Sequence, residues 1–273
     1  METKQKNKET LISVIIPAYK QEKSIQNDLL RIKNVLDQLR HDYEMIVVVD
    51  GYLDKTLENA KKIKSSKIII TGYKHNHGKG NAVRFGMAKA KGDIIAFIDS
   101  GMDINPNGLS MLLEHFEWYN ADVIVGSKLH PVSKVRYPFQ RKILSWGYRT
   151  IVRILFGLSI RDTQVGIKFF KRKVLEDVLP RLLIKKYAFD IEILAIAHYL
   201  GYKRIFEAPI ELDFKTVSSI ASLASIDFYK TIFHMLWDTL AVFYRLKILS
   251  YYDNGNKRKW KYDPELDFKV NIG

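Results

Sequence analysis

Two carboxylates lie close together in the sequence, directly after a short apolar segment. Asp99 and Asp103 follow the run Ile94–Ile98, which is typical of a buried strand. Two such acids can share a hard divalent cation such as Mg²⁺ or Mn²⁺, which prefers carboxylate oxygens and usually also binds substrate phosphates. A loop whose acid caps the next helix would have the same residues. The pattern suggests a metal site and leaves the capping interpretation open.

A glycine-containing segment, Asn76–Ala82, precedes this strand. Gly78 and Gly80 would allow the backbone to approach a ligand closely, and Lys79 supplies a cation. The segment is not a dinucleotide-binding fingerprint, because the third glycine is missing, and it is not a P-loop, because no Ser or Thr follows Lys79. A ligand-binding loop and a plain tight turn are therefore both compatible with it.

Two further polar segments lie later in the chain. Asp162–Gln164 precedes Gly166 and an aromatic strand that begins near Lys168, as expected for the floor of an active site. A turn capped by Asp162 is the alternative. The second segment places Asp190 and Glu192 at the start of a predicted helix, where acids also complement the helix dipole.

Basic residues are concentrated between positions 128 and 153. Arg141 and Ser145 are four residues apart, so on a helix they would share one face, suited to holding a phosphate. A solvated basic face is the alternative interpretation. The basic residues of this stretch are Lys128, Arg136, Arg141, Lys142, Arg149 and Arg153.

Short strand-like runs rich in Ile and Val alternate with longer helical patterns, which predicts right-handed crossovers and a parallel sheet. Ligands bind at the carboxyl ends of such strands, where several of the polar residues above lie. The predicted strands are 11–18, 44–50, 67–71, 93–99, 121–127 and 204–212, with a strand-containing return at 161–171; the predicted helices are 24–39, 56–65, 107–119, 138–158, 175–183 and 189–200, and a further helix opens within 78–90.

Composition narrows the class of protein. The hydrophobic fraction of 47% is sufficient for a sizeable core, and the absence of cysteine excludes disulfides and thiolate chemistry. The formal charge of +14 favours an anionic partner, namely nucleic acid, anionic lipid or a phosphorylated substrate, although an ordinary basic surface would also account for it. Residues 1–10 lack the apolar segment of a signal peptide, and no stretch approaches the roughly 18 apolar residues of a spanning helix. We therefore expect a cytoplasmic protein.

The last 60 residues differ from the rest. Between Ile226 and Leu249 the polar residues form one narrow helical stripe and nearly all others are apolar, which is typical of a helix that is buried or lies in a membrane interface. The basic cluster Lys257–Lys261 surrounds Trp260. Attachment to the inner face of a membrane, packing on the rest of the chain and homo-oligomer formation all remain open. We divide the chain into a polar tail (1–10), a catalytic domain (11–215) and a C-terminal amphipathic helix with a basic tail (216–273).

In order along the chain, these segments resemble the family 2 glycosyltransferases of GT-A type, and among them the polyprenyl- and dolichyl-phosphate mannosyl- and glucosyltransferases. The resemblance covers about residues 10–215. Val14–Tyr19 with Glu22 is similar to the family's first strand and nucleotide-binding loop, and Gly78–Ala82 to the segment that closes over the nucleoside diphosphate. The other matching segments are Val48–Gly51 with Asp54 and Thr56, Gly126–Lys128, Asp162–Lys168 and Phe189–Glu192.

The chain departs from the family pattern at two places. Val49 precedes Asp50 where the family usually has two adjacent acids. Asp99 matches the first acid of the family's metal-binding D-x-D, but Gly101 replaces the second, and Asp103 follows two residues later. We infer that Asp99 and Asp103 share the metal, with a weaker or absent metal site as the alternative.

The resemblance implies an α/β, Rossmann-like, mostly parallel sheet flanked by helices, and a role for each matched residue. Asp99 and Asp103 would bind Mg²⁺ or Mn²⁺, Asp162, Asp99 and Arg141 would be catalytic, and Asp190 and Glu192 would contact the sugar or support the floor. The acceptor phosphate would contact Lys128, Arg136, Arg141 and Ser145. The nucleotide sugar would contact Pro17, Ala18, Tyr19, Glu22, Asp50, Gly78, Lys79, Asn81, Asp99, Gln164 and Gly166.

The implied reaction is inverting transfer of a hexose from a UDP- or GDP-sugar to a polyprenyl phosphate at a membrane surface. Use of another acceptor, or a non-catalytic membrane-associated relative with Gly101 in place of an acid, are the alternatives. A nucleotidyltransferase would carry a glycine-rich loop after the first strand, and Pro17–Lys23 contains no glycine. A nucleic-acid-binding protein would interleave basic and aromatic residues along one element, and only the short tail does so.

Overall fold

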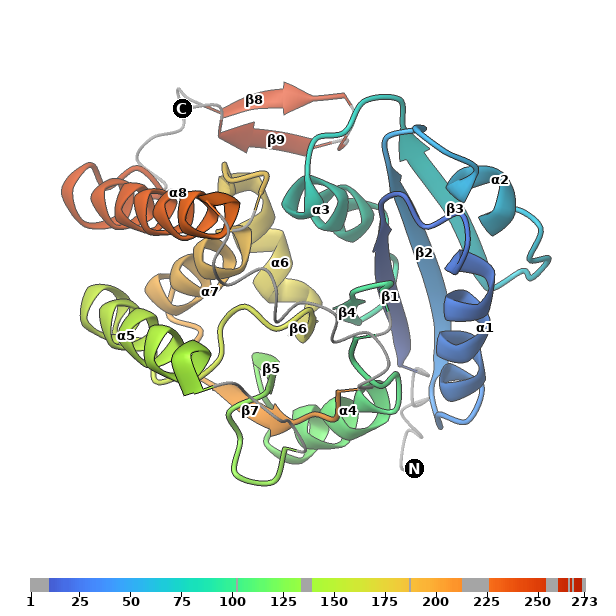
Figure 1. Ribbon diagram of the computed structural model, residues 1–273, viewed down its shortest axis with the longest axis horizontal. Helices are drawn as coiled ribbons and strands as arrows, with labels where there is room; N and C mark the ends of the chain where they lie inside the picture. The colour runs from blue at the N-terminus through green and yellow to red at the C-terminus, as the bar shows by residue number, and fades with distance from the viewer. Residues whose placement is uncertain are drawn as a thin grey trace, which may run out of the picture.

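The computed structural model describes residues 10–101, 103–133, 139–186, 188–212, 226–253, 260–264, 266 and 268–271. A seven-stranded sheet in the order β3-β2-β1-β4-β6-β5-β7 runs through the molecule, with helices on both faces (Figure 1). The strands are β1 (Leu11–Ala18), β2 (Asp42–Asp50), β3 (Ile68–Tyr73), β4 (Ile94–Ile98), β5 (Val123–Ser127), β6 (Ile167–Lys171) and β7 (Ile205–Pro209).

The mostly parallel α/β sheet predicted from the alternating pattern is confirmed. β1 pairs in parallel with both β2 and β4, and β5 pairs in parallel with β7. β6 alone runs antiparallel, between β4 and β5. This reversed strand brings the segment that precedes it, including Gly166, to the carboxyl end of β4, where Asp99 begins the next loop.

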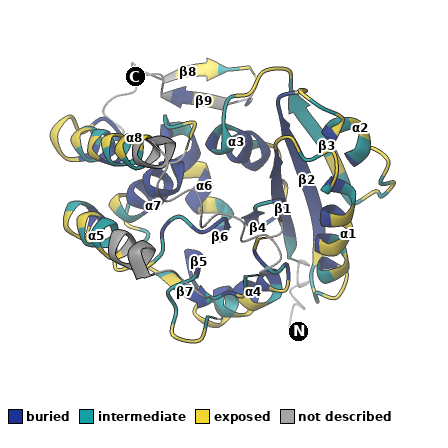
Figure 2. Ribbon diagram, viewed as in Figure 1, coloured by how far each residue is buried: buried dark blue, intermediate teal, exposed yellow. Residues whose placement is uncertain are grey.

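The helices cover the two faces of the sheet and form two apolar cores. α1 and α4 pack on one face, while α3, α6 and α7 pack on the other together with parts of α5 and α8. The inner strands of the sheet and the inner sides of the helices are buried, whereas the edge strands β3 and β7 and the outer sides of the helices are partly or fully exposed (Figure 2). The helices are α1 (Ile25–Leu36), α2 (Thr56–Ala60), α3 (Lys79–Lys89), α4 (Gly108–Trp118), α5 (Phe139–Phe156), α6 (Arg172–Val178), α7 (Phe189–Tyr199) and α8 (Ile226–Phe243).

Several predicted boundaries are wrong by one turn or more. The helix expected over 56–65 ends at Ala60, and the one expected over 175–183 begins at Arg172 and gives way to a short 3-10 turn, η1 (Leu179–Arg181). A π-helical turn, η4 (Tyr244–Ile248), continues α8. The antiparallel pair β8 (Trp260–Asp263) and β9 (Phe268–Asn271) was not predicted; β9 contacts η1, and the pair lies at the top of Figure 1. Residues 257–259 of the basic cluster lie outside the described residues.

The C-terminal helix packs on the sheet domain with one side. Thr239, Val242 and Leu246 are buried, and the Tyr148 hydroxyl of α5 lies 2.9 Å from the Thr239 hydroxyl. Packing on the rest of the chain therefore accounts for this inner side. Its outer side is exposed. Within the described ranges, no helix combines the length and apolarity that crossing a bilayer requires.

Candidate active site

A cleft of about 570 Å³ opens at the carboxyl ends of β1, β2 and β4, within the range typical of ligand pockets. Parallel strands that end together expose loop residues and backbone groups at one edge, which is why such edges carry sites. The cleft also borders the first turn of α3 and the segment that precedes α7. Its lining residues are Pro17, Ala18, Tyr19, Gln21, Asp50, Asn76, Gly78, Lys79, Asp99, Ser100, Gly101, Asp103 and Lys186.

Asp50, at the end of β2, fixes the loop before α3. Its carboxylate accepts hydrogen bonds from the backbone N–H groups of His77 (2.8 Å) and Gly78 (3.0 Å) and from the Asn76 amide (2.9 Å). Three donors converge on this buried carboxylate, so the loop is held in one position at the cleft wall.

Gly78 and Gly80 are close to other parts of the chain, whereas the sequence suggested that they allow a ligand to approach. A Cβ at Gly78 would lie 2.7 Å from the carbonyl oxygen of Lys185, and a Cβ at Gly80 would lie 2.6 Å from the Phe189 Cβ. Packing against Lys185 and Phe189 therefore leaves no room for a side chain at either position. Gly78 also has φ of +97°, a backbone conformation that favours glycine.

Lys79 forms an ion pair with Asp99 inside the cleft, with 2.7 Å between Nζ and Oδ2. Burial lowers the pKa of Lys79, but the charges of Asp99 and Asp190 raise it by more, so its pKa lies above the usual value. The amine is therefore protonated at neutral pH and offers a positive charge at the floor of the cleft.

Asp99 rests on Gly166. The Asp99 N–H donates to the Gly166 carbonyl at 2.8 Å, and a side chain at position 166 would collide with the Asp99 carboxylate. Gly166 therefore does not line the cleft itself but gives the Asp99 carboxylate its place there.

The residues at this point fit a divalent cation. Asp99 Oδ1 is buried and has no hydrogen-bond partner in the described structure, and Asp103 lines the same cleft. Hard cations take such carboxylate oxygens together with substrate phosphates. Among the described residues, leaving aside its chain neighbours, a Cβ built at Gly101 would have one atom within 4 Å, the Gln21 amide nitrogen at 3.8 Å. The position of the missing acid therefore has room for a side chain.

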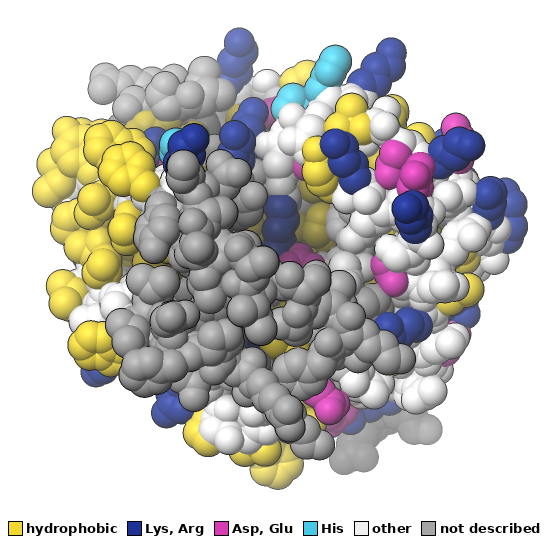
Figure 3. Space-filling model, in the orientation of Figure 1, with side chains coloured by type: hydrophobic (Ala, Val, Ile, Leu, Met, Phe, Trp, Pro, Cys, Tyr) yellow, Lys and Arg dark blue, Asp and Glu magenta, His cyan; other side chains and the backbone are white. Residues whose placement is uncertain are grey.

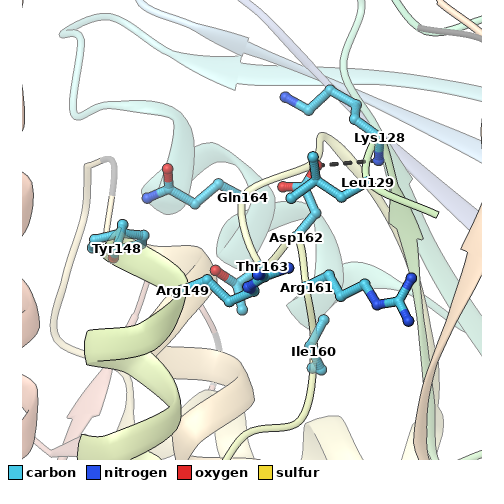
Figure 4. Close-up of a pocket in the computed structure, with 9 residues that line it drawn as sticks. All are labelled: Lys128, Leu129, Tyr148, Arg149, Ile160, Arg161, Asp162, Thr163 and Gln164. Carbon is cyan, nitrogen blue, oxygen red and sulfur yellow. Dashed lines mark hydrogen bonds between the residues drawn. The ribbon is translucent and has the colours of Figure 1, made fainter. Parts of the chain in front are cut away.

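A second, smaller pocket of about 90 Å³ surrounds Asp162 (Figure 4). The Asp162 carboxylate accepts the Lys128 N–H at 3.1 Å, and its own N–H donates to Glu207 at 2.9 Å. In Figure 4, Arg149 enters from α5, while Gln164 points toward Tyr148. The lining of the pocket thus combines one carboxylate, Asp162, with the basic residues Lys128, Arg149 and Arg161.

The two acids of α7 are buried inside the molecule. Asp190 forms an ion pair with Lys168 at 2.5 Å, and Lys168 also donates to the Val165 carbonyl. Burial lowers the pKa of Lys168, and the charge of Asp190 opposes this shift. Glu192 is fully buried and accepts the N–H groups of residues 183 and 184. Both carboxylates therefore bind groups inside the protein, and neither is among the residues that line the donor cleft.

The remaining predicted site residues lie near the cleft, in the smaller pocket or outside the described residues. Glu22 and Asn81 lie near the cleft but do not line it: Glu22 accepts the Lys55 N–H, and Asn81 donates its N–H to the Lys185 carbonyl. Gln164 lines the smaller pocket. Arg136 lies outside the described residues, as do the side chains of the α5 residues Arg141 and Ser145.

Several residues that line the two pockets were not among the predicted site residues. Gln21, Ser100 and Arg161 could have been predicted, because each is next to a predicted site residue: Glu22, Asp99 and Asp162 respectively. Lys186 could not be predicted in this way, because it lies three residues before the matching segment Phe189–Glu192. Its place in the donor cleft follows from the fold.

Comparison with known proteins agrees with this geometry. The sequence profile described as Glycosyl transferase family 2 matches residues 13–179, more than half of the chain. The chain belongs to this family. The range matched by the profile includes all the residues that line the donor cleft except Lys186.

Among curated proteins, the chain is similar to dolichyl-phosphate beta-glucosyltransferases. It is 34% identical over 205 residues to that of Drosophila melanogaster (69% of this chain, 63% of the relative) and 30% identical over 260 residues to one from Trichomonas vaginalis (89% and 76%). It is 31% identical to that of Dictyostelium discoideum, again spanning 63% of the relative's length.

Among solved structures, the fold is that of GT-A glycosyltransferases. The chain is similar to glucosyl-3-phosphoglycerate synthase from Mycobacterium tuberculosis, in complex with Mn²⁺, UDP-glucose and phosphoglyceric acid (TM-score 0.62, 19% identity, 86% of this chain and 79% of that chain). A second complex of that enzyme, with Mn²⁺, UDP and phosphoglyceric acid, gives a TM-score of 0.60 at 21% identity, covering 86% and 78%.

Proposed function

We propose that this chain transfers glucose from UDP-glucose to the phosphate of dolichol or a related polyprenol, at a membrane surface. The observation that carries the proposal is a pair of pockets: a donor cleft containing Asp50, Lys79 and Asp99, and a basic pocket around Asp162. The segment Gln164–Gly166 connects them, because Gln164 lines the basic pocket and the Gly166 carbonyl accepts the Asp99 N–H. The dolichyl-phosphate beta-glucosyltransferases among the relatives support the choice of sugar and acceptor.

The chemistry follows from the charges in the two pockets. An oxygen of the acceptor phosphate attacks the anomeric carbon, the bond from that carbon to the UDP oxygen breaks, and UDP leaves with the electron pair. The nucleophile is already an anion, so no strong base is needed. UDP-glucose is an α-glucoside, and attack opposite the leaving group therefore gives the β product.

The residues of the cleft stabilise the leaving group. Lys79 is protonated and lies where negative charge grows on the departing diphosphate. Asp99 and Asp103 would hold a divalent cation, which supplies further positive charge beside the diphosphate. Asp50 contributes by holding the Asn76–Gly78 loop against the donor.

The acceptor phosphate would bind in the pocket around Asp162. Lys128 and Arg149 supply cations there, and Asp162 orients the acceptor or the donor sugar. Arg136, Arg141 and Ser145 remain part of the proposal as further acceptor contacts.

The exposed side of α8 provides a surface for the membrane. Phe233 and Trp237 are each 64% exposed and stack at 6.5 Å between ring centroids, and Trp146 and Ile154 of α5 are exposed nearby. Figure 3 shows hydrophobic side chains gathered at the left, where α8 and α5 lie in Figure 1. An apolar helix face of this kind can insert into the headgroup region of a bilayer. The acceptor pocket includes residues of α5, so the lipid phosphate would be near.

The function is tested by a donor and acceptor screen. Radiolabelled UDP- and GDP-hexoses are each incubated with a short polyprenyl phosphate or with 3-phosphoglycerate, and the label in the lipid phase and in the aqueous product is counted. We expect lipid-phase label with UDP-glucose. Transfer only to 3-phosphoglycerate, or no transfer with any donor, would show the proposed acceptor or the proposed activity to be wrong.

The membrane surface has a separate test. Sedimentation with anionic liposomes should fall severalfold when Phe233 and Trp237 are both replaced by Ser. Trp118→Ser is the matched control, because Trp118 is 86% exposed on α4. Equal loss in both variants, or no loss in either, would argue against α8 as the attachment face.

A further inference from the structure

The segment Leu183–Lys186, here called the wall segment, reaches the donor cleft through its last residue, Lys186. It lies against the first turn of α3, where the Lys185 carbonyl accepts the Asn81 N–H at 3.1 Å. The contact is so close that Gly78 has no room for a side chain, since a Cβ there would also lie 3.2 Å from the Lys186 Cγ. The position of this segment is therefore fixed relative to Lys79.

Lys186 is the cation that this wall adds to the donor cleft. It lines the cleft together with Lys79 and Asp99, and its side chain is exposed. Lys186 forms no ion pair within the described ranges. Burial raises the pKa of Asp238 and the charge of Lys186 opposes this shift, so that carboxylate lies near Lys186 on the α8 side. Lys79, by contrast, is occupied by Asp99. An exposed, charged lysine at the rim of a cleft can turn toward an anionic ligand at little cost in hydrogen bonds.

A buried network holds the segment from behind. Glu192 Oε2 accepts the N–H groups of Leu183 (3.0 Å) and Ile184 (2.8 Å), and Glu192 Oε1 accepts the Tyr252 hydroxyl at 2.8 Å. Arg181 Nε in turn donates to the Tyr252 carbonyl at 2.8 Å. Glu192 and Tyr252 are 0% and 1% exposed, so the network is sealed from water.

These contacts extend from the C-terminal part of the chain to the donor cleft. Resting on the proposed function, we propose that Lys186 binds the diphosphate of the nucleotide sugar and that Glu192 and Tyr252 are positioning residues that hold it there. The match to the family profile ends at residue 179, before any of these residues. Two lysines then face the diphosphate from two elements, Lys79 from α3 and Lys186 from the wall segment.

The neighbouring lysine supplies a matched control. Lys185 has the same chemistry and is also exposed, but of the two pockets that border the described part of this segment it lines the one on the α8 side, with Asp238 and Arg245, and not the donor cleft. Lys186 borders both pockets. Removal of the Lys185 charge should therefore leave donor binding unchanged.

Calorimetric titration with UDP and with uridine tests the assignment. Lys186→Met should bind UDP at least tenfold more weakly than the wild type and bind uridine equally well, whereas Lys185→Met should match the wild type for both. Equal UDP affinity in Lys186→Met and the wild type would overturn the proposal. A wild type that does not bind UDP would instead overturn the proposed function.

The positioning role is tested by a double-mutant cycle. Tyr252→Phe removes one hydroxyl and should weaken UDP binding severalfold in the wild-type background but not in Lys186→Met, because the effect acts through Lys186. It should also accelerate tryptic cleavage after residues 185 and 186. Glu192→Gln keeps the acceptor oxygen and should retain most of the UDP affinity. Additive losses in the double variant, with thermal melting showing folded protein, would overturn the positioning role.

Discussion

Gly166→Ala should inactivate the chain by moving one carboxylate. The added Cβ would meet Asp99 Oδ2 and Cγ far inside the 3.0 Å below which such contacts essentially never occur. The carboxylate must therefore move by about 1 Å, and a misplacement of that size can cost about 100-fold in rate. The core around β6 should lose about 1–3 kcal/mol of stability from overpacking.

Steady-state glucosyl transfer and urea unfolding measure the two effects separately. We expect kcat to fall by about 100-fold while the protein remains folded at assay temperature. Gly101→Ala is the matched control in the same cleft, because within the described residues its Cβ would have the Gln21 amide at 3.8 Å as its nearest neighbour, which is ordinary van der Waals contact. If Gly166→Ala kept wild-type kcat, or if both alanine variants lost activity equally, the placement of Asp99 on Gly166 would not matter for catalysis and the reasoning would be refuted.

Three further predictions concern single groups. Asp50→Asn leaves at least one of the three hydrogen-bond donors around that side chain unsatisfied, so urea unfolding should show a loss of about 1–3 kcal/mol and the KM for the nucleotide sugar should rise; unchanged values would contradict this. Gly101→Asp, which places a second acid in open space, should lower the Mn²⁺ concentration needed for half-maximal activity, and an unchanged metal titration would count against a metal at Asp99. Burial raises the pKa of Asp122, but the hydrogen bonds and charge of Arg204 lower it by more, so it lies below 3.8 in the folded protein. Its stabilising effect is full above pH 3.8 and is lost as the pH falls through the folded value, so Asp122→Asn should flatten the acid limb of the stability curve measured by circular dichroism; an unchanged limb would refute the assignment.

The sheet could be predicted because each of its longer strands has a recognisable pattern within its own short segment of sequence. Runs such as Leu11–Ala18 are buried on both faces and are therefore almost continuously apolar. The reversed direction of β6 has no such signal, since a five-residue strand shows the same pattern in either direction. The β8–β9 pair was missed for a related reason, because each strand has only four residues.

The donor site was predictable where its residues follow a strand directly, as Asp50 and Asp99 do. Contacts between distant segments were not. Gly78 and Gly80 have the composition of a ligand-binding loop, but their neighbours are Lys185 and Phe189, about a hundred positions away in sequence. Glu192 was assigned a helix-start position, and only the fold shows that its carboxylate accepts bonds from three other residues.

The most direct test of the central claim is transfer of label from UDP-[¹⁴C]glucose to a polyprenyl phosphate in liposomes, measured for the wild type and for Asp99→Asn at matched folding stability. The account predicts a β-linked, lipid-soluble product that forms with the wild type and is reduced by at least a hundredfold in the variant. A wild type that leaves all label in the aqueous phase, or a variant that forms the lipid product at the wild-type rate, would contradict it.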